Sequence, residues 1–202
     1  MEFNEYKYLW PPRPSKAVPV NLLNHYERQG WIGQFKKNGT CTVLYVPPDK
    51  KIITKTRHNT DHKTWVPSRE FAGQFITLPG NGWYAFAGEL LRGDTLYIFD
   101  LLVNNGDYLV DRTLDERLNQ LRGLFPKKAA SIRKSHYIAN SKLWIAETIS
   151  SNFVEVYKSL FSDEDEGLVL KDPKSKLSMC LTVESNSAWQ IKCRKPTKKY
   201  TF

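Results

Sequence analysis

The feature that most constrains this chain is a pair of apolar runs separated only by Asn38-Gly39. The first run begins at Trp31, and the second extends from Thr40 to Val46. Asn-Gly between two such runs is the strongest short-range signal for a β-hairpin, because both residues tolerate positive φ. The sequence therefore predicts a hairpin over this stretch.

Side chains alternate across a strand, so the first run is expected to divide its residues between two faces. Gln34 and Lys36 should share one face, while Phe35 and Lys37 should share the other. This pattern places a lysine beside a polar amide close to a tight turn. It also fits a surface hairpin with solvated lysines, so the stretch alone does not define a site.

The composition favours a polyanionic partner. The 202 residues include 30 Lys and Arg against 21 Asp and Glu, which gives a net charge of +9 and a pI near 9.4. Such a balance is typical of proteins that bind phosphate or nucleic acid. The three cysteines, Cys41, Cys180 and Cys193, lack metal-ligand spacing and predict free thiols in a reducing cytosol. No membrane-spanning run or signal-peptide pattern is seen, so we expect an intracellular protein without a membrane partner.

The rest of the chain predicts a single α+β domain at residues 20–202, preceded by a proline-rich arm at residues 1–19. Helices are expected at 21–28, capped by Asn21, at a capping box opened by Thr113 and Glu116, and at 153–161. Strands are expected at 51–57, 83–91, 95–103, 137–149, 167–171 and 188–194. Because strands outnumber helices and short turns join them, we expect antiparallel β-sheets flanked by helices.

Several short segments occur in a distinctive order along the chain. They are Lys36-x-Asn38-Gly39, Arg57, Gly88-Glu89-Leu90, Tyr97-Ile98-Phe99-Asp100, Glu166-Gly167-Leu168-Val169-Leu170-Lys171 and Trp189-x-x-Lys192-x-Arg194. This order resembles the nucleotidyltransferase motifs of covalent ligases and mRNA capping enzymes. The segment from Glu166 to Lys171 is most similar to ATP-dependent DNA ligases. The resemblance implies a ligase adenylation domain and covers the chain from the Lys36 region to its end.

The resemblance implies a three-step reaction that uses ATP and Mg²⁺. A lysine, here Lys36, attacks the α-phosphorus of ATP, and the AMP then passes to a 5′-phosphate before a 3′-hydroxyl seals the nick. A free lysine has a pKa of about 10.4, so only about one in 2,500 is neutral at pH 7, an activation deficit of about 4.6 kcal/mol. A nearby cation, Mg²⁺ or Lys192, would lower that pKa and stabilise the departing pyrophosphate.

The resemblance also assigns the other site residues. Glu89 and Glu166 take the positions of Mg²⁺ ligands, and carboxylates are natural ligands for that ion. The nucleotide contacts are Gln34 at the adenine edge, Phe99 against the purine, Arg57 at the ribose or phosphate, Lys192 and Arg194 at the phosphates, and Phe35, Asn38 and Gly39 beside the nucleophile. Lys171 has the opposite strand parity from Glu166 and is therefore expected outside the site.

The chain departs from the usual ligase pattern in several places. Asn38 stands where an aspartate is usual, Cys41 where many DNA ligases have arginine, and Arg194 where a second lysine is usual. The oligonucleotide-binding domain of DNA ligases is expected to be missing. Either this domain alone performs every step, or a protein partner supplies the missing clamp, or the chain is a fragment.

Four functions remain open at this point. Sealing of nicked duplex DNA is favoured, followed by RNA ligation, then mRNA capping guanylyl transfer, and then a non-catalytic nucleic-acid-binding module. The basic stretch from Lys195 to Lys199 would contact nucleic acid in a salt-dependent way.

Overall fold

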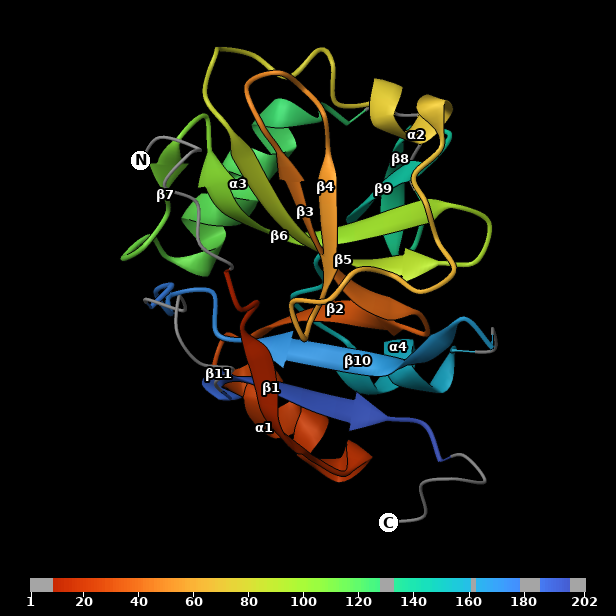
Figure 1. Cartoon of the computed structure of the whole chain (residues 1–202). Helices are drawn as coiled ribbons and strands as arrows, with labels where there is room; N and C mark the ends of the chain where they lie inside the picture. Colours follow the sequence, from red (N-terminus) through yellow and green to blue (C-terminus); the bar gives the residue numbers. More distant parts are fainter. Residues whose placement is uncertain (1–8, 128–132, 161–162, 179–185, 197–202) are drawn as a thin grey trace.

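The computed structural model describes residues 9–127, 133–160, 163–178 and 186–196, which form two β-sheets with helices beside them (Figure 1). The strands are β1 (Arg13–Ala17), β2 (Ile32–Lys37), β3 (Thr40–Val46), β4 (Ile53–Thr56), β5 (Tyr84–Leu91), β6 (Thr95–Asn104), β7 (Asp107–Tyr108), β8 (His136–Asn140), β9 (Leu143–Ala146), β10 (Asp165–Lys171) and β11 (Asn186–Arg194). The helices are a 3-10 turn η2 (Val20–Leu22), α1 (Leu23–Arg28), α2 (Arg69–Gly73), α3 (Leu114–Leu124) and α4 (Phe153–Lys158).

The smaller sheet has the order β1-β11-β10-β2, and the larger one has the order β4-β3-β5-β6-β9-β8, with β7 paired to β6. In Figure 1 the smaller sheet lies in the lower half with α1 and α4, and the larger sheet lies in the upper half with α2 and α3. The predicted α+β class with antiparallel sheets and flanking helices is confirmed. Two pairs differ from that description, because β1–β11 and β6–β9 run parallel.

The predicted hairpin at Asn38-Gly39 is wrong. Strand β2 pairs with β10 in the smaller sheet, whereas β3 pairs with β4 and β5 in the larger one. Neither Asn38 nor Gly39 has positive φ. Asn38 instead donates its backbone N–H to the carbonyl of Glu164 at 2.8 Å, and a Cβ on Gly39 would lie 2.3 Å from the carbonyl oxygen of Leu90. The Asn-Gly pair therefore carries the chain from one sheet to the other, and the glycine is required by close packing.

Most other predicted elements are present with shifted bounds. The capping box at Thr113 and Glu116 opens α3 with both of its reciprocal hydrogen bonds. Asn21, expected as a helix cap, lies inside the 3-10 turn, and the N-cap of α1 is Leu22 without a side-chain bond. Residues 13–17 of the expected arm are extended, as the prolines suggest, but they form β1 and so belong to the smaller sheet.

Two hydrophobic clusters hold the sheets in place. The larger one joins the seven-stranded sheet to α2 and α3, with Phe75, Phe86 and Leu118 among its buried members. The smaller one packs α1 and α4 against the other sheet through Leu23, Phe153 and neighbouring residues. Cys41 and Cys193 are free thiols, and Cys180 lies outside the described residues. Among the described residues, no helix combines the length and the apolar character required to span a bilayer.

Candidate active site

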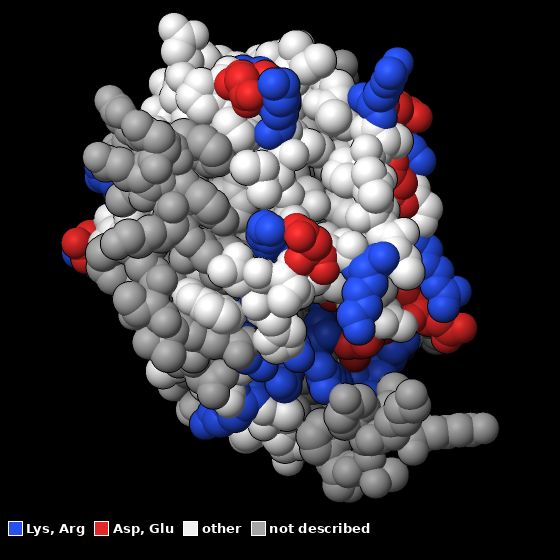
Figure 2. All heavy atoms as spheres, in the orientation of Figure 1, with Lys and Arg blue, Asp and Glu red and all other residues white. Residues whose placement is uncertain are grey.

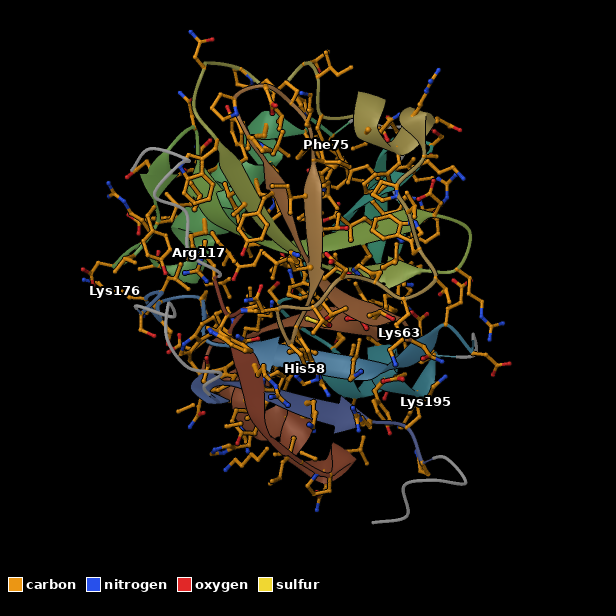
Figure 3. All side chains as sticks on the ribbon, in the orientation of Figure 1. His58, Lys63, Phe75, Arg117, Lys176 and Lys195 are labelled. Carbon is orange, nitrogen blue, oxygen red and sulfur yellow. The ribbon has the colours of Figure 1, made fainter. Side chains whose placement is uncertain are left out.

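A cavity of about 710 Å³ lies where the two sheets meet. Its wall on the side of the smaller sheet comes from β2, β10, β11 and β1, and its opposite wall comes from β3, β5 and β6. The segment between β4 and α2 supplies a further wall, which includes His58 and Lys63 (Figure 3). Segments from almost the whole length of the chain therefore surround one space.

The register of the smaller sheet places three rows of side chains on the face that borders this cavity. Directly opposed residues of an antiparallel pair share a face, so the pairing across β2, β10 and β11 defines each row. The rows are Ile32, Lys171 and Gln190; then Gln34, Val169 and Lys192; and then Lys36, Gly167 and Arg194. The first two rows carry the apolar and amide groups with one lysine each, and the third row carries two cations, Lys36 and Arg194.

Lys36 and Glu166 form an ion pair in the third row. The Nζ of Lys36 donates to a carboxylate oxygen of Glu166, and the two side chains are 18% and 30% exposed. Glu166 lies within an irregularity in the pairing of β10 with β2, between Asp165 and Gly167. Gly167 there has φ +145, and a Cβ on it would lie 2.0 Å from the carbonyl oxygen of Cys193. The glycine thus permits the bend that turns Glu166 toward Lys36.

Glu89 faces the cavity from β5 and is the second acidic group near the lysine. Burial raises the pKa of Glu89 to about 7; Lys36 opposes this rise, Glu166 adds to it, and Arg57 and the backbone N–H of Gly39 oppose it. The Gly39 N–H donates a hydrogen bond to the Glu89 carboxyl, which the close approach of the glycine to β5 makes possible. Two carboxyl groups therefore border one lysine in a partly desolvated space.

The cationic groups on β11 border the same space. Burial lowers the pKa of Lys192, and the positive charges of Arg194, Lys36, Arg13 and Arg57 lower it further. Both Lys192 and Arg194 are partly buried. Arg57, at the end of β4, is exposed, and its Nε donates to Nε2 of His58 at 3.0 Å.

The cavity as a whole has an excess of positive charge. Eight Lys and Arg side chains line it against three acidic ones, Asp61, Glu89 and Glu166. Figure 2 shows Lys and Arg gathered on the lower half of this face, over β10 and β11. An excess of cations over acidic groups in a concave site favours a polyanionic ligand.

The other end of the cavity suits an aromatic base. Phe99, from β6, lines it with Gln34, Val169 and Lys171. The Gln34 side chain is 1% exposed, and its Oε1 has no hydrogen-bond partner among the described atoms, while its Nε2 lies 3.4 Å from the Phe99 carbonyl oxygen. A buried amide oxygen without a partner is costly unless a ligand donates to it.

The expectation that Lys171 lies outside the site is wrong. Its Nζ lies over the Phe99 ring, 4.8 Å from the centroid, and its side chain lines the cavity. Burial lowers the pKa of Lys171 to about 8, with a smaller opposing effect of Asp100. The parity argument failed because it counted along β10 from Glu166, on the far side of the irregularity at Gly167. Counting from Gly167 gives the observed face.

Other expected site residues take different positions. Asn38 is exposed and is not among the lining residues. Phe35 is 4% exposed and belongs to the smaller hydrophobic cluster, although it also borders the cavity. Lys37 points away from Lys36 and pairs with Asp165, with 2.7 Å between Nζ and Oδ1. The structure thus distinguishes the two adjacent lysines, because Lys36 alone of the pair contacts Glu166.

Phe99 is anchored by a buried ion pair on the other side of β6. Asp100 accepts hydrogen bonds from Nε and Nη2 of Arg117 at 2.9 and 2.8 Å, and the Arg117 guanidinium lies over Trp189 of β11. Both side chains of the ion pair are essentially inaccessible to solvent. This contact links α3 to β6 next to the cavity, and Figure 3 shows Arg117 on the α3 side. The spacing of Asp100 and Arg117 gave no signal of this pairing in the sequence.

Comparison with known proteins supports a ligase domain. Residues 92–186, slightly less than half of the chain, match the family model of the ATP dependent DNA ligase domain. No curated protein matches the chain in sequence.

Solved structures share the fold across most of the chain. A mycobacterial DNA ligase D complexed with ATP and MES has a TM-score of 0.64 and 14% identity, covering 92% of this chain and 60% of its own. The ligase domain of LigD from M. tuberculosis has a TM-score of 0.67 and 15% identity, covering 96% and 62%. A Lig E DNA ligase, described as binding DNA with a minimal scaffold, has a TM-score of 0.55 and 15% identity, covering 91% and 68%.

The present chain therefore spans about 60% of the length of the two LigD structures that it matches. At identities of 14 and 15%, the structural likeness establishes the fold alone. The family match covers the chain from just before β6 to the start of β11. Residues 92–186 are thus similar to the ATP dependent DNA ligase domain family, and the chain as a whole shares its fold with solved ligase structures.

Proposed function

We propose that this chain is an ATP-dependent DNA ligase that forms a covalent AMP adduct on Lys36. The observation that carries the proposal is the meeting of Lys36 with Glu166, Glu89 and the β11 cations in one cavity. A surface lysine would not require two carboxyl groups from different sheets beside it. The excess of positive charge in the cavity suits a triphosphate and a phosphorylated strand.

In the first step, the Nζ of Lys36 attacks the α-phosphorus of ATP. The new P–N bond forms as the bond from the α-phosphorus to the bridging oxygen breaks, and pyrophosphate takes the leaving electron pair. Glu166 accepts a hydrogen bond from Nζ, so it orients the amine and is placed to receive its proton. Lys192 and Arg194 offset the negative charge that develops on the phosphates.

The acidic groups also fit a divalent cation. Glu89 and Glu166 are two oxygen donors close enough that the charge of Glu166 raises the pKa of Glu89, a repulsion that a cation would relieve. When bound, Mg²⁺ would neutralise phosphate charge at this position. We propose Glu89 and Glu166 as its protein ligands.

The other end of the cavity provides a site for the adenine. Phe99 offers an aromatic face, and the open Oε1 of Gln34 can accept from an exocyclic amino group. The Nζ of Lys171, which lies over Phe99, can donate a hydrogen bond to a ring nitrogen of the base. Adenine presents both an amino donor and ring acceptors, which supports ATP as the substrate.

Transfer of AMP to a 5′-phosphate and attack by a 3′-hydroxyl complete the proposed reaction. The basic face over β10 and β11 in Figure 2 supports binding of a nicked duplex there. We propose residues 20–202 as the adenylation domain and residues 1–19 as the arm that contributes β1 to it. A protein partner that holds the far side of the duplex remains part of this proposal.

Incubation of the purified chain with labelled ATP or GTP and Mg²⁺ tests the first step. We expect covalent AMP on the wild type and none on Lys36→Ala. Lys158→Ala, an exposed position on α4, serves as a control that should label normally. Label from GTP alone, or unchanged labelling of Lys36→Ala, would contradict the proposal.

Sealing assays on matched nicked substrates test the second part. Nicked DNA, a nicked DNA–RNA hybrid and nicked RNA of the same sequence should be compared at equal concentration. We expect the fastest sealing on DNA. Faster sealing of RNA would assign the chain to RNA ligation, and strong binding without any adduct would make it a nucleic-acid-binding module.

A further inference from the structure

Tyr157, on α4, lies behind the sheet that carries the proposed nucleophile. It packs against the smaller hydrophobic cluster and is not among the described residues that line the cavity. Cys193, which alternates with Arg194 along β11, is buried in the same cluster, whereas Arg194 lines the cavity. The Tyr157 hydroxyl donates to the backbone carbonyl of Arg194, the last residue of β11, at 2.7 Å. A residue outside the cavity therefore holds the end of a strand that supplies a cation to it.

The end of β11 also holds the backbone of Glu166. The register between β10 and β2 pairs Asp165 and Gly167 but passes over Glu166. The carbonyl of Glu166 accepts a hydrogen bond from the N–H of Lys195, the residue that follows β11, at 2.8 Å. Movement of this strand end would therefore shift the residue that accepts from the Lys36 amine.

The helix that presents Tyr157 is fixed at both of its ends. At its start, the Glu27 carboxylate of α1 accepts from the backbone N–H groups of Asn152 and Phe153 at 3.0 and 2.9 Å. Beyond its end, the carbonyl of Leu160 accepts from the Nζ of Lys195, which is labelled in Figure 3, at 3.2 Å. The hydrogen bond to β11 is thus made from a fixed support.

The hydroxyl of Tyr157 can be separated from its ring. Burial raises the pKa of this phenol, so it stays protonated and remains a donor at neutral pH. A tyrosine that only filled the hydrophobic cluster would not need the hydroxyl, because the ring alone supplies the apolar contact. Conversion to phenylalanine therefore removes the hydrogen bond and retains the packing.

We propose that Tyr157 is a positioning residue of this active site: its hydroxyl fixes the end of β11 and, through the Lys195 N–H, the backbone of Glu166. The inference rests on the proposed ligase function and adds a residue that lies outside the cavity. Displacement of a reacting group by about 1 Å can slow a reaction about 100-fold, so a small shift of Glu166 suffices. The effect should fall on the rate of adduct formation, because the residues proposed to bind the adenine lie at the other end of the cavity.

Tyr157→Phe is the main variant, and Tyr137→Phe is its matched control. Tyr137 also donates its hydroxyl to a backbone carbonyl, that of Phe125, at 2.7 Å, and it is likewise absent from the described lining of the cavity. Tyr137 is completely buried and Tyr157 is partly buried, so the control should destabilise the fold at least as much. Any effect of stability alone should therefore appear in both variants.

Single-turnover labelling at several ATP concentrations gives the saturated rate and the half-saturating ATP concentration. It is measured at a temperature where every variant is folded by circular dichroism. We expect Tyr157→Phe to lower the saturated rate at least about tenfold and to leave the half-saturating concentration within about twofold of wild type. Tyr137→Phe should match wild type in both. Equal saturated rates for the two variants, or an effect confined to the half-saturating concentration, would overturn the proposal.

Amide hydrogen exchange provides a readout that does not depend on activity. The Lys195 N–H should exchange at least about fivefold faster in Tyr157→Phe, because its hydrogen bond to Glu166 is weakened, and should be unchanged in Tyr137→Phe. Unchanged exchange in Tyr157→Phe would also overturn the proposal. Absence of covalent AMP on the wild type would instead refute the proposed ligase function, and exchange at Lys195 would still decide whether Tyr157 holds the strand end.

Discussion

The Nζ of Lys36 on β2 donates to the carboxylate of Glu166, which lies at the start of β10 and 130 residues further along the chain. The contact depends on the irregularity in β10, because regular pairing from Gly167 onward places Lys171 on this same face. Glu166 and Lys171 thus reach one cavity in spite of their opposite parity in the sequence.

This ion pair predicts that Glu166→Gln will retain the fold but lose adduct formation. The side chains are 18% and 30% exposed, so removal of the charge should change the free energy of unfolding by about 1 kcal/mol or less. Adduct formation should fall about 100-fold, because the amine loses its acceptor. Single-turnover labelling with ATP and urea unfolding measure the two effects. Asp163→Asn is the exposed control, and equal labelling by both variants would refute the role of Glu166.

Glu89 predicts a pH-dependent stability in the absence of Mg²⁺. Its pKa is raised from 4.5 to about 7, so the folded protein binds more protons than the unfolded chain between these values. The contribution of Glu89 is therefore fully present below about pH 4.5 and is lost as pH rises toward 7.

The variant Glu89→Gln removes this titration. Its free energy of unfolding should rise relative to wild type as pH increases from about 4.5 to 7, by at most about 1.4 kcal/mol per pH unit. Above that range the difference should stay constant. Urea unfolding at several pH values checks this, with the exposed Glu155→Gln as control. The same pH profile for both variants would exclude a perturbed Glu89.

The lowered pKa of Lys171 predicts that the stability of the fold depends on pH with the opposite sign. Burial lowers its pKa from 10.5 to about 8, so the unfolded chain binds the extra proton between these values and stability rises with pH across that window. Lys171→Met should be more stable than wild type at pH 7, and this advantage should shrink as pH approaches 10.5. The variant should also bind ATP more weakly, because a donor beside Phe99 is lost. Lys174→Met, an exposed neighbour, should show neither effect.

The buried pair of Asp100 and Arg117 predicts strong coupling in a double-mutant cycle. Arg117→Met leaves a buried carboxylate without its partner and should cost about 3–5 kcal/mol in the free energy of unfolding. Asp100→Asn combined with Arg117→Met should recover part of that loss, because neither charge then remains. Additive effects of the two changes would show that the pair does not anchor β6. Thermal unfolding of the four proteins provides the measurement.

The sequence predicted the elements better than their pairing. Alternation and the capping box located β5, β6 and α3, because those signals are local. The hairpin predicted at Asn38-Gly39 was wrong, because the close approach of Gly39 to Leu90 depends on a strand about fifty residues away. Motif order singled out Lys36, Glu89 and Glu166, and all three line one cavity. The position of Lys171 was not predicted, because the irregularity in β10 shifts the alternation of side chains and leaves no signal in the sequence.

Gly167 allows the bend in β10 to be tested separately from the charges. It has φ +145, and an added Cβ would lie 2.0 Å from the carbonyl oxygen of Cys193, a backbone atom that cannot rotate away. Gly167→Ala should therefore destabilise the fold by about 1–3 kcal/mol. It should also reduce adduct formation beyond the effect on stability, because relief of the clash moves Glu166 away from Lys36.

The matched control is Gly123→Ala in α3, where an added Cβ meets no atom within 4 Å. Alanine is the better helix former, so this change should stabilise the protein by up to about 1 kcal/mol and leave labelling unchanged. Labelling is measured at a temperature where both variants are folded by circular dichroism. Full adduct formation by folded Gly167→Ala would mean that Glu166 reaches Lys36 without the bend, and that the irregularity in β10 is unrelated to the chemistry.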